Sequence, residues 1–343
     1  MTVDDTRSDG RPTLEVVAAR AGVGRGTVSR VINGSPQVSE RARQAVQRAI
    51  EELGYVPNRA ARSLVTRRTD SIALVVSEPE DRVFAEPFFA GVVRGISAEL
   101  ADTPMQLWLA MTTSSAERGR VERHLTPQHI DGVLLLSLHG DDPLPGKLEA
   151  SGLPTVLGGR MIGAEAHSCV DVDNAGGARL AVDHLLERGR RAIATIAGPQ
   201  DMHVGVARLT GYREALQAAG VSVDEDLIVY GDFSESSGVE SMRELLRRRS
   251  DLDAVFAVSD PMAIGAMQVL KEQGRRIPDD VAVVGFDGSP MARHTEPPLT
   301  TVHQPAEAMG RNMARLLLAR IAGEAVSPPC VILTPDLVVA QSS

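Results

Sequence analysis

From Ser71 onward, short apolar runs of strand length alternate with longer segments of helical periodicity. Strands are predicted at residues 72–78, 105–111, 132–138, 192–198, 254–260 and 281–287, with a last one at 331–340. Helices are predicted at residues 88–101, 175–189, 205–219, 237–249 and 261–273. This alternation is typical of parallel sheets covered by helices on both faces. Roughly 270 residues of this pattern exceed one comfortable sheet. We therefore expect a mixed α/β body of two doubly wound subdomains.

Polar and aromatic residues gather where the predicted strands end. In open α/β sheets a ligand lies beyond the carboxyl ends of the strands. The candidate ligand-binding residues at these positions are Phe88, Asp173, Arg208, Phe233, Ser259, Asp260 and Asp287. Carboxylates, an arginine and aromatic rings suit a neutral, hydroxyl-rich ligand, because charged groups bind hydroxyls in pairs and a sugar ring packs on an aromatic face. In the alternative interpretation, each Phe belongs to the core and each Asp caps a helix.

The charge of the chain is unevenly distributed. The formal net charge is −9, which taken alone argues against nucleic acid binding. Residues 11–68, however, contain eleven Arg, no Lys and four Glu, a net charge of +7, which leaves −16 on the remainder. A basic segment on an acidic body is expected when that segment neutralises phosphates. A solvated pair of basic helices is the alternative.

Three short helices are predicted in this basic segment. Thr13 is a candidate N-cap for the first helix, and Ser39 for the third. A tight turn at residues 22–24 separates the first two helices, so an all-α helix-turn-helix module is predicted. A phosphate-binding glycine loop is the competing interpretation of this turn, but it needs a preceding strand, and here a helix precedes. In a helix-turn-helix the second helix enters the major groove, where Arg25 and Arg30 are candidates for reading guanine.

Residues 57–65 predict a helix of one or two turns capped by Asn58. Such a short helix is marginal in water, so it should form only when something supports it. The alternative is an ordinary linker helix with Leu64 packed on the body. We divide the chain into a helix-turn-helix domain at 11–56, a hinge and linker at 57–70, and a ligand-binding and dimerisation domain at 71–343.

Composition limits the remaining possibilities. No apolar run approaches the ~20 residues that cross a bilayer, and the acidic N-terminus lacks the pattern of an export signal, so we expect a cytoplasmic protein without membrane contact. Cys169 and Cys330 have no metal-ligand spacing. They are expected to be buried thiols without redox or zinc chemistry, and no cofactor or metal is expected.

Three stretches carry a specific resemblance: TLEVVAARAGV, TVSRVING and VSERARQAVQRAIEELGYVPNRAARSL, which run in one register from Thr13 to Leu64. They resemble the LacI/GalR family of bacterial repressors. The resemblance implies that Thr27 and Ser29 contact phosphates, and that Arg25, Gly26 and Arg30 occupy base-reading positions. It also implies that the hinge helices pair in the minor groove, where Leu64 is the apolar wedge. The full set of implied DNA contacts is Thr13, Arg25, Gly26, Thr27, Ser29, Arg30, Asn33, Asn58, Arg59, Ala61, Arg62 and Leu64.

The resemblance extends over the body through stretches such as GARLAVDHLLERGR and VAVVGFDG. It implies that Arg208, Asp287 and Ser259-Asp260 contact the ligand, and that Phe233 lines the pocket. The loop at 78–89 is about four residues longer than is usual in the family, and Glu86 stands where an Asn is common. The implied protein is a periplasmic-binding-protein-like sensor on a DNA-binding head. It would act as a homodimeric repressor on palindromic operator DNA, controlled by a monosaccharide or oligosaccharide.

Two other classes of protein remain open at this point. A sugar-binding receptor without a transcriptional role would share the fold of the body. An enzyme is the third class, but we find no GxSxG elbow, HExxH, Walker loop or Ser/His/Asp set at a recognisable spacing.

Overall fold

The computed structural model describes residues 12–32, 35–56, 68–163, 167–327 and 329–343. The chain forms two compact units, residues 1–69, called the head below, and residues 70–343, called the body. Each is described by itself. No helix in the described ranges is long and apolar enough to cross a membrane.

Three helices form the described part of the head: α1 (Leu14–Ala21), α2 (Arg25–Ile32) and α3 (Glu40–Leu53). As predicted, Thr13 caps α1 and Ser39 caps α3, each through its hydroxyl oxygen, which accepts a hydrogen bond from a backbone N–H of the first turn. Gly22 ends α1 with a φ of 67°, a left-handed conformation that favours glycine. The helices enclose a small core of Val17, Ala18, Val28, Val46, Ala49 and Tyr55.

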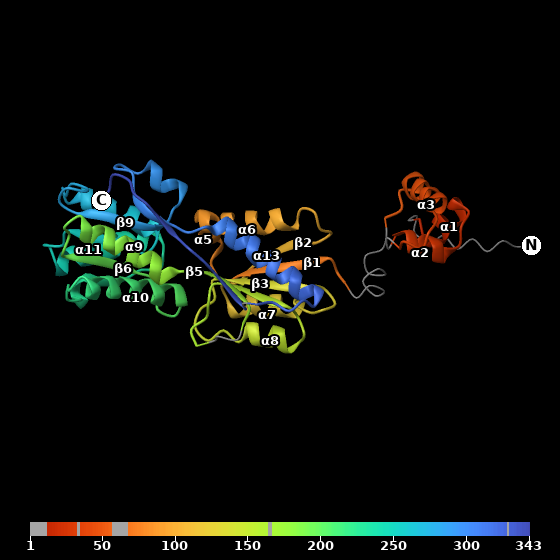
Figure 1. The fold of residues 1–343 in the computed structure, drawn as a ribbon, viewed down its shortest axis with the longest axis horizontal. Coiled ribbons are helices and arrows are strands. Elements are labelled where there is room, and N and C mark those ends of the chain that lie inside the picture. The colour runs from red at the N-terminus through yellow and green to blue at the C-terminus, as the bar shows by residue number, and fades with distance from the viewer. Residues whose placement is uncertain (1–11, 33–34, 57–67, 164–166, 328) are drawn as a thin grey trace, which may run out of the picture. The chain divides into compact units, whose positions relative to one another are not determined.

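The body contains two six-stranded sheets, each with helices (Figure 1). The first sheet is entirely parallel, in the order β11-β5-β4-β3-β1-β2. Its strands are β1 (Ser71–Val76), β2 (Gln106–Met111), β3 (Gly132–Leu136), β4 (Thr155–Gly158), β5 (Cys169–Val172) and β11 (Cys330–Leu333). Its helices are α5 (Glu80–Ala85), α6 (Pro87–Leu100), α7 (Ser115–His124), α8 (Leu144–Ala150) and α13 (Ala306–Ala322). These elements form the first subdomain.

The second sheet has the order β12-β10-β9-β8-β6-β7, with β12 antiparallel to β10 and the other pairs parallel. Its strands are β6 (Ile193–Ala197), β7 (Ile228–Tyr230), β8 (Ala254–Ala257), β9 (Ala282–Asp287), β10 (Thr300–His303) and β12 (Asp336–Val338). Its α-helices are α9 (Asn174–Glu187), α10 (His203–Ala218), α11 (Glu235–Arg248) and α12 (Asp260–Glu272). The short 3-10 helices Glu225–Leu227 and Pro290–His294 complete this second subdomain.

Alternation along β1 shows how the first sheet is covered. Ile72, Leu74 and Val76 pack with α6 and α13 on one face, which Figure 1 shows side by side. Ala73 and Val75 pack with α7 and α8 on the other face. Because successive side chains of a strand point to opposite faces, a strand covered on both sides is apolar throughout. This is why the central strands could be predicted as continuous apolar runs.

The chain passes between the two subdomains three times. The first passage joins β5 to α9 at Asp173, the second joins β10 to α13 through residues 304–305, and the third joins β11 to β12 through residues 334–335. The single strand predicted at 331–340 is therefore wrong. Pro335 lies between β11 and β12, and proline lacks the N–H that a continuous strand ladder requires.

The two cysteines form a disulfide, which corrects the prediction of buried thiols. Cys330 on β11 lies directly opposite Cys169 on β5, with 4.4 Å between the Cα atoms. This distance is within the range that a disulfide spans. The pairing depends on the register of two strands that are 161 residues apart in sequence. No spacing pattern in the sequence could have revealed it.

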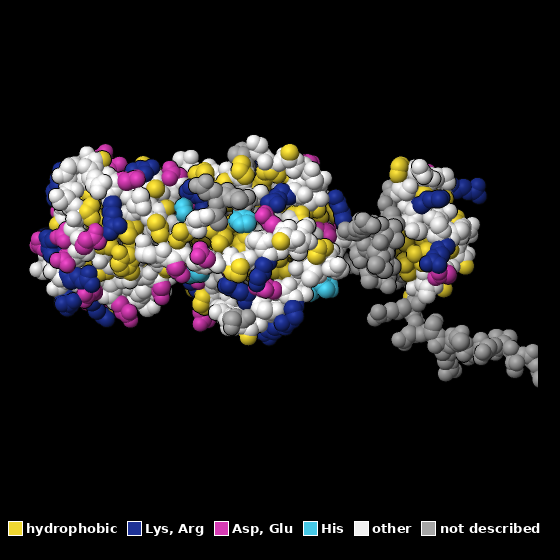
Figure 2. All heavy atoms as spheres, turned by 90° about the horizontal axis from the view of Figure 1, so that it is seen from below, with side chains coloured by type: hydrophobic (Ala, Val, Ile, Leu, Met, Phe, Trp, Pro, Cys, Tyr) yellow, Lys and Arg dark blue, Asp and Glu magenta, His cyan; other side chains and the backbone are white. Residues whose placement is uncertain are grey.

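Acidic and basic side chains are interspersed on the face of the body seen in Figure 2. The body carries exposed ion pairs such as Arg276–Asp280 at 2.6 Å and Arg213–Glu225 at 3.0 Å. This face therefore has no continuous basic surface of the kind that follows a phosphate backbone.

Candidate DNA interface and ligand cleft

The second helix of the head has one buried face and one exposed face. Val28 is fully buried in the small core, whereas Arg25, Gly26 and Arg30 are exposed. Arg25 forms an ion pair of 3.1 Å with Glu15, and both side chains are largely exposed. An exposed pair of this kind is weak and easily exchanged for a phosphate or a base. The geometry thus presents two arginines on one helix, as a recognition helix requires.

The other predicted DNA contacts differ in what the structure shows. Thr27 and Ser29 are half-buried on α2, and Thr13 is exposed while it caps α1. The remaining predicted contacts lie outside the described residues: Asn33, Asn58, Arg59, Ala61, Arg62 and Leu64.

A cleft in the body contains a cavity of about 90 Å³ where the carboxyl ends of both sheets meet. Its lining includes Arg82, Glu86, Phe88, Ser137, Arg160, Asp171, Asn174, His203, Arg208, Phe233, Ser259, Asp287 and Gln304. The position is the one expected for a ligand site between α/β sheets.

Arg208 is the buried cation of this cleft. It lies within α10 and exposes only 3% of its surface. Its Nε donates to Asn174 Oδ1 at 2.9 Å, and its Nη1 donates to the Val258 carbonyl at 2.5 Å. The guanidinium also covers the Phe286 ring at 3.6 Å. Burial lowers the pKa of Arg208 to about 10, although Asp287 opposes this change. The side chain remains charged and its orientation is fixed.

Asp287 approaches Arg208 from the end of β9, with 3.6 Å between Oδ1 and Nη1. Gln304 donates to the same carboxylate oxygen at 2.7 Å. Burial raises the pKa of Asp287 to about 6, while Arg208 opposes the rise. The two side chains are 79 positions apart in sequence, and the structure brings these two candidate ligand residues together at the cavity.

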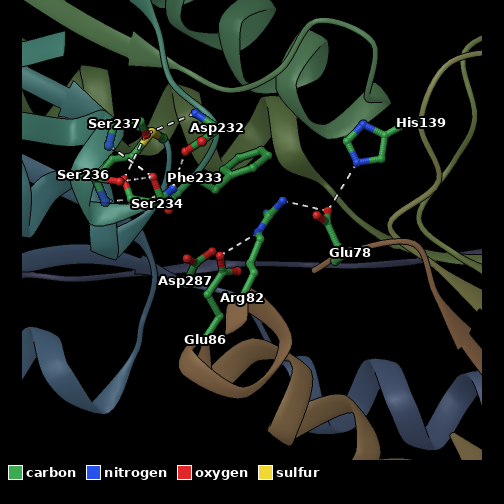
Figure 3. Close-up of polar contacts among 12 residues, drawn as sticks. Glu78, Arg82, Glu86, His139, Asp232, Phe233, Ser234, Ser236, Ser237 and Asp287 are labelled. Atoms are coloured by element: carbon green, nitrogen blue, oxygen red, sulfur yellow. Dashed lines mark hydrogen bonds and ion pairs between the residues drawn. The ribbon is translucent and has the colours of Figure 1, made fainter. Parts of the chain in front are cut away.

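Residues on α5 and on both sides of it form a second charged group in the cleft (Figure 3). Arg82 donates to Glu86 at 2.7 Å through Nε and pairs with Glu78 at 2.7 Å through Nη1. Its guanidinium lies over the Phe233 ring of the second subdomain at 4.9 Å. Burial raises the pKa of Glu86 to about 7, although Arg82 opposes the rise.

Backbone strain also concentrates at this cleft. The described non-glycine residues with positive φ are Asp70, Ser137, Phe233 and Asp287, and the last three line the cavity. A left-handed conformation costs energy for a residue with a side chain, so it persists only where the surrounding structure enforces it. Strain of this kind is found mainly at binding and catalytic sites.

The structure separates the seven predicted ligand residues into two groups. Phe88, Arg208, Phe233, Ser259 and Asp287 line the cavity. Asp173 does not: its carboxylate caps α9 by accepting from Gly176 N at 2.8 Å. Asp260 is completely buried and accepts from Thr301 Oγ1 at 2.5 Å and Ser289 N at 2.6 Å. These two support the fold, because their oxygens already have protein donors.

Several lining residues, among them Asp171 and His203, were not predicted from the sequence. Asp171 and Asn174 flank the first passage between the subdomains, at the end of a short strand that was not predicted. Asn174 donates to Asp171 Oδ1 at 3.1 Å and accepts from Arg208, so it positions both charges. His203 presents a buried Nδ1 that has no hydrogen-bond partner in the described part of the chain. Burial lowers the pKa of His203, which favours its neutral form.

Comparison with protein families accounts for both units. Residues 13–58 match the family described as "Bacterial regulatory proteins, lacI family", and residues 182–343 match the "Periplasmic binding protein-like domain". These matches define the class of protein, a DNA-binding module joined to a ligand sensor.

Comparison with full-length proteins identifies the family. The chain is 60% identical to the HTH-type transcriptional regulator CelR of Thermobifida fusca, over 97% of this chain and 98% of that protein. The structure of a transcriptional regulator CelR-cellobiose complex has 58% identity and a TM-score of 0.79, covering 97% of this chain and all of that one. The lac repressor dimer bound to operator and the anti-inducer ONPF has 27% identity and a TM-score of 0.84, covering 97% and 99%.

The chain belongs to the lacI family of bacterial regulatory proteins. It is a DNA-binding transcriptional regulator whose action is controlled by a ligand. The resemblance and the fold class predicted from the sequence are both confirmed.

Proposed function

We propose that this regulator represses transcription as a homodimer on a palindromic operator, and that a neutral glucose disaccharide of the cellobiose type controls it. The observation that carries the choice of ligand is the buried Arg208–Asp287 pair beside Phe233, in which Asp287 ends β9 and Arg208 reaches the cavity from α10. The likeness to a CelR structure that contains cellobiose supports the same choice.

The chemistry of the cleft fits hydroxyl groups. A sugar hydroxyl accepts one hydrogen bond and donates another, so it is matched by a guanidinium beside a carboxylate. Arg208 and Asp287 supply such a pair, and Ser259 lies on the same cavity. We propose Phe88, Arg208, Phe233, Ser259 and Asp287 as ligand contacts. We add Asp171 and His203, because both line the cavity and His203 Nδ1 is unpaired among the described residues.

In the head, we propose that Arg25 and Arg30 read bases, with Gly26 at a third base-facing position, while Thr27 and Ser29 contact phosphates. The exposure of both arginines on α2 supports this assignment. We keep the hinge and linker at 57–70 as a third functional segment between helix-turn-helix and sensor. Because the DNA target of a bacterial regulator is in the cytoplasm, we place the protein there.

Control follows from linkage between two sites. A ligand that contacts both subdomains favours one relative orientation of the two, and this preference is transmitted to the DNA-binding state of the dimer. The three passages between the subdomains are the segments that must accommodate such a change. We assign no catalytic step to the protein, since the relatives are transcriptional regulators and the cleft groups are explained by binding.

A two-stage experiment tests this function. Thermal unfolding would be measured with cellobiose, maltose, lactose, glucose and a nucleobase, each at several concentrations. Ligand at about 100 times its Kd should stabilise the protein by about 2.7 kcal/mol. Cellobiose is expected to give the largest shift and to change binding to palindromic DNA from upstream of the gene, measured by fluorescence anisotropy. If the nucleobase alone shifts the transition, the sugar assignment is wrong. A sugar that binds without any effect on DNA binding would support the receptor alternative.

A further inference from the structure

Arg82 occupies the middle of the ligand cleft, on the helix of the lengthened 78–89 loop (Figure 3). Glu78 and Glu86 each bind it at 2.7 Å, and the pair holds the guanidinium over Phe233. The Arg82 and Glu86 side chains expose only 17% and 14% of their surface, so the charges are well shielded from water.

The aromatic ring beneath Arg82 is not available to a ligand in this arrangement. Phe233 exposes only 4% of its surface, and the tip of its ring lies against the backbone of Gly198. A sugar ring that packs on an aromatic face needs that face uncovered. Arg82 is the flexible side chain that covers it, whereas Gly198 belongs to the fixed end of β6.

The size of the cavity leads to the same conclusion. At about 90 Å³ it is far below the ~300–1,000 Å³ typical of ligand sites. A second cavity of about 140 Å³ adjoins it, and Glu86, Phe88, Asp287 and Gln304 line both. Two of these shared residues, Glu86 and Phe88, belong to the 78–89 loop. Movement of α5 and its side chains would therefore uncover Phe233 and would also shift Glu86, which lies between the two cavities.

We propose that Arg82 determines ligand specificity by occupying the place of a sugar ring on Phe233, so that a ligand must displace it in order to bind. This inference rests on the proposed sugar-binding function. Displacement leaves Glu86 without its guanidinium donor and leaves Glu78 with the longer contact to His139 Nε2 at 3.4 Å. A buried carboxylate that loses a donor is unfavourable. The cleft thus favours ligands rich in hydroxyl donors over rings that have none. Ligand hydroxyls can donate hydrogen bonds to the two carboxylates in place of the Arg82 guanidinium.

Calorimetry with an Arg82→Ala variant tests the proposal. Without the competing side chain, cellobiose should bind about tenfold more tightly, a change in the range expected for a cation–π contact between shielded groups. Arg82→Lys keeps a positive charge between the carboxylates but has no planar group to cover the ring, so an intermediate gain is expected. Arg179→Ala is the matched control, since Arg179 is a half-exposed arginine that pairs with Glu214 at 2.6 Å on the surface. The affinity of the Arg179→Ala variant for cellobiose should equal that of the wild type.

A readout on the wild-type protein makes the test independent of how well the variants fold. The Nε–H resonance of Arg82, assigned by its absence from Arg82→Lys, should be shifted by the Phe233 ring current and should lose that shift when cellobiose saturates the protein. Weaker or unchanged cellobiose affinity in Arg82→Ala would overturn the proposal, as would a wild-type resonance that keeps its ring-current shift. If no sugar binds the wild type at all, the proposed function fails instead, and the two failures are thereby distinguished.

Discussion

Replacement of Arg208 by methionine should destabilise the body in a way that depends on pH. The substitution keeps most of the side-chain volume but removes the charge and the donors. Asp287 then loses its buried ion-pair partner, and the Asn174 and Val258 oxygens lose a donor. Removing one member of a buried pair costs about 3–5 kcal/mol. We expect a loss of about 4 kcal/mol in the free energy of unfolding at pH 8.

The pH dependence follows from Asp287. Its pKa is already raised to about 6, and Arg208 holds it below what burial alone would give. Without Arg208 the pKa rises further, so the folded variant retains a proton at a pH where the unfolded chain releases it. A carboxyl group with a raised folded pKa contributes stability at low pH that is lost as pH rises through that pKa. The deficit of Arg208→Met should therefore be smaller at pH 5 than at pH 8.

Urea unfolding followed by circular dichroism at both pH values measures this difference. The double variant Arg208→Met/Asp287→Asn removes both charges, so it should be more stable than the single variant at pH 8 and lose the excess pH dependence. The electrostatic reasoning would be refuted by equal deficits at pH 5 and pH 8, or by a double variant that is no more stable than Arg208→Met.

Three further predictions concern other parts of the molecule. Arg30→Ala should weaken operator binding by about 1–3 kcal/mol in anisotropy titrations without changing sugar affinity; an equal loss on random DNA would count against base reading. Cys330→Ser, or reduction of the wild type, should lower the thermal midpoint, because the disulfide to Cys169 closes a loop across 161 positions and is worth up to about 5 kcal/mol in the chain-entropy model. No change on reduction would contradict this. Gly95→Ala should cost about 1–3 kcal/mol, since a Cβ there would collide with the α13 backbone at Glu307, whereas Gly119→Ala in α7 meets only the tip of one side chain and serves as the control. Equal stability of the Gly95→Ala and Gly119→Ala variants would exclude close packing of α6 on α13.

The structure could be predicted from the sequence where a local pattern determines it. The central strands are covered on both faces, so each appears as an apolar run, and the helices of the head are marked by capping residues such as Thr13 and Ser39. The edge strand β7 could not be predicted, because its three residues are too few for a periodic signal. The position of Asp287 at the cavity could be predicted, because it ends a strand and ligands lie beyond strand ends.

The rest of the site depends on contacts that the sequence does not contain. No local sequence pattern indicates that Thr301 and Ser289 donate hydrogen bonds to Asp260. Because of these donors, the Asp260 carboxylate is not available to a ligand. Likewise the lengthened loop could be seen in the sequence, but not that it forms a helix whose Arg82 reaches Phe233 in the other subdomain. The partners of Asp260 and Arg82 depend on the register of distant strands and on the direction of their side chains, neither of which can be predicted from a local pattern.

One short stretch near the C-terminus has a genetic consequence. Residues 330–333 are an edge strand of one sheet, and residues 336–338 are an edge strand of the other. A nonsense mutation just before Cys330 would therefore remove a strand from both subdomains at once. It would uncover the backbone of β5 and of β10, and uncovered sheet edges pair with other chains. The truncated proteins should aggregate rather than act as half-functional sensors, so nonsense alleles just before codon 330 should behave as complete loss of function.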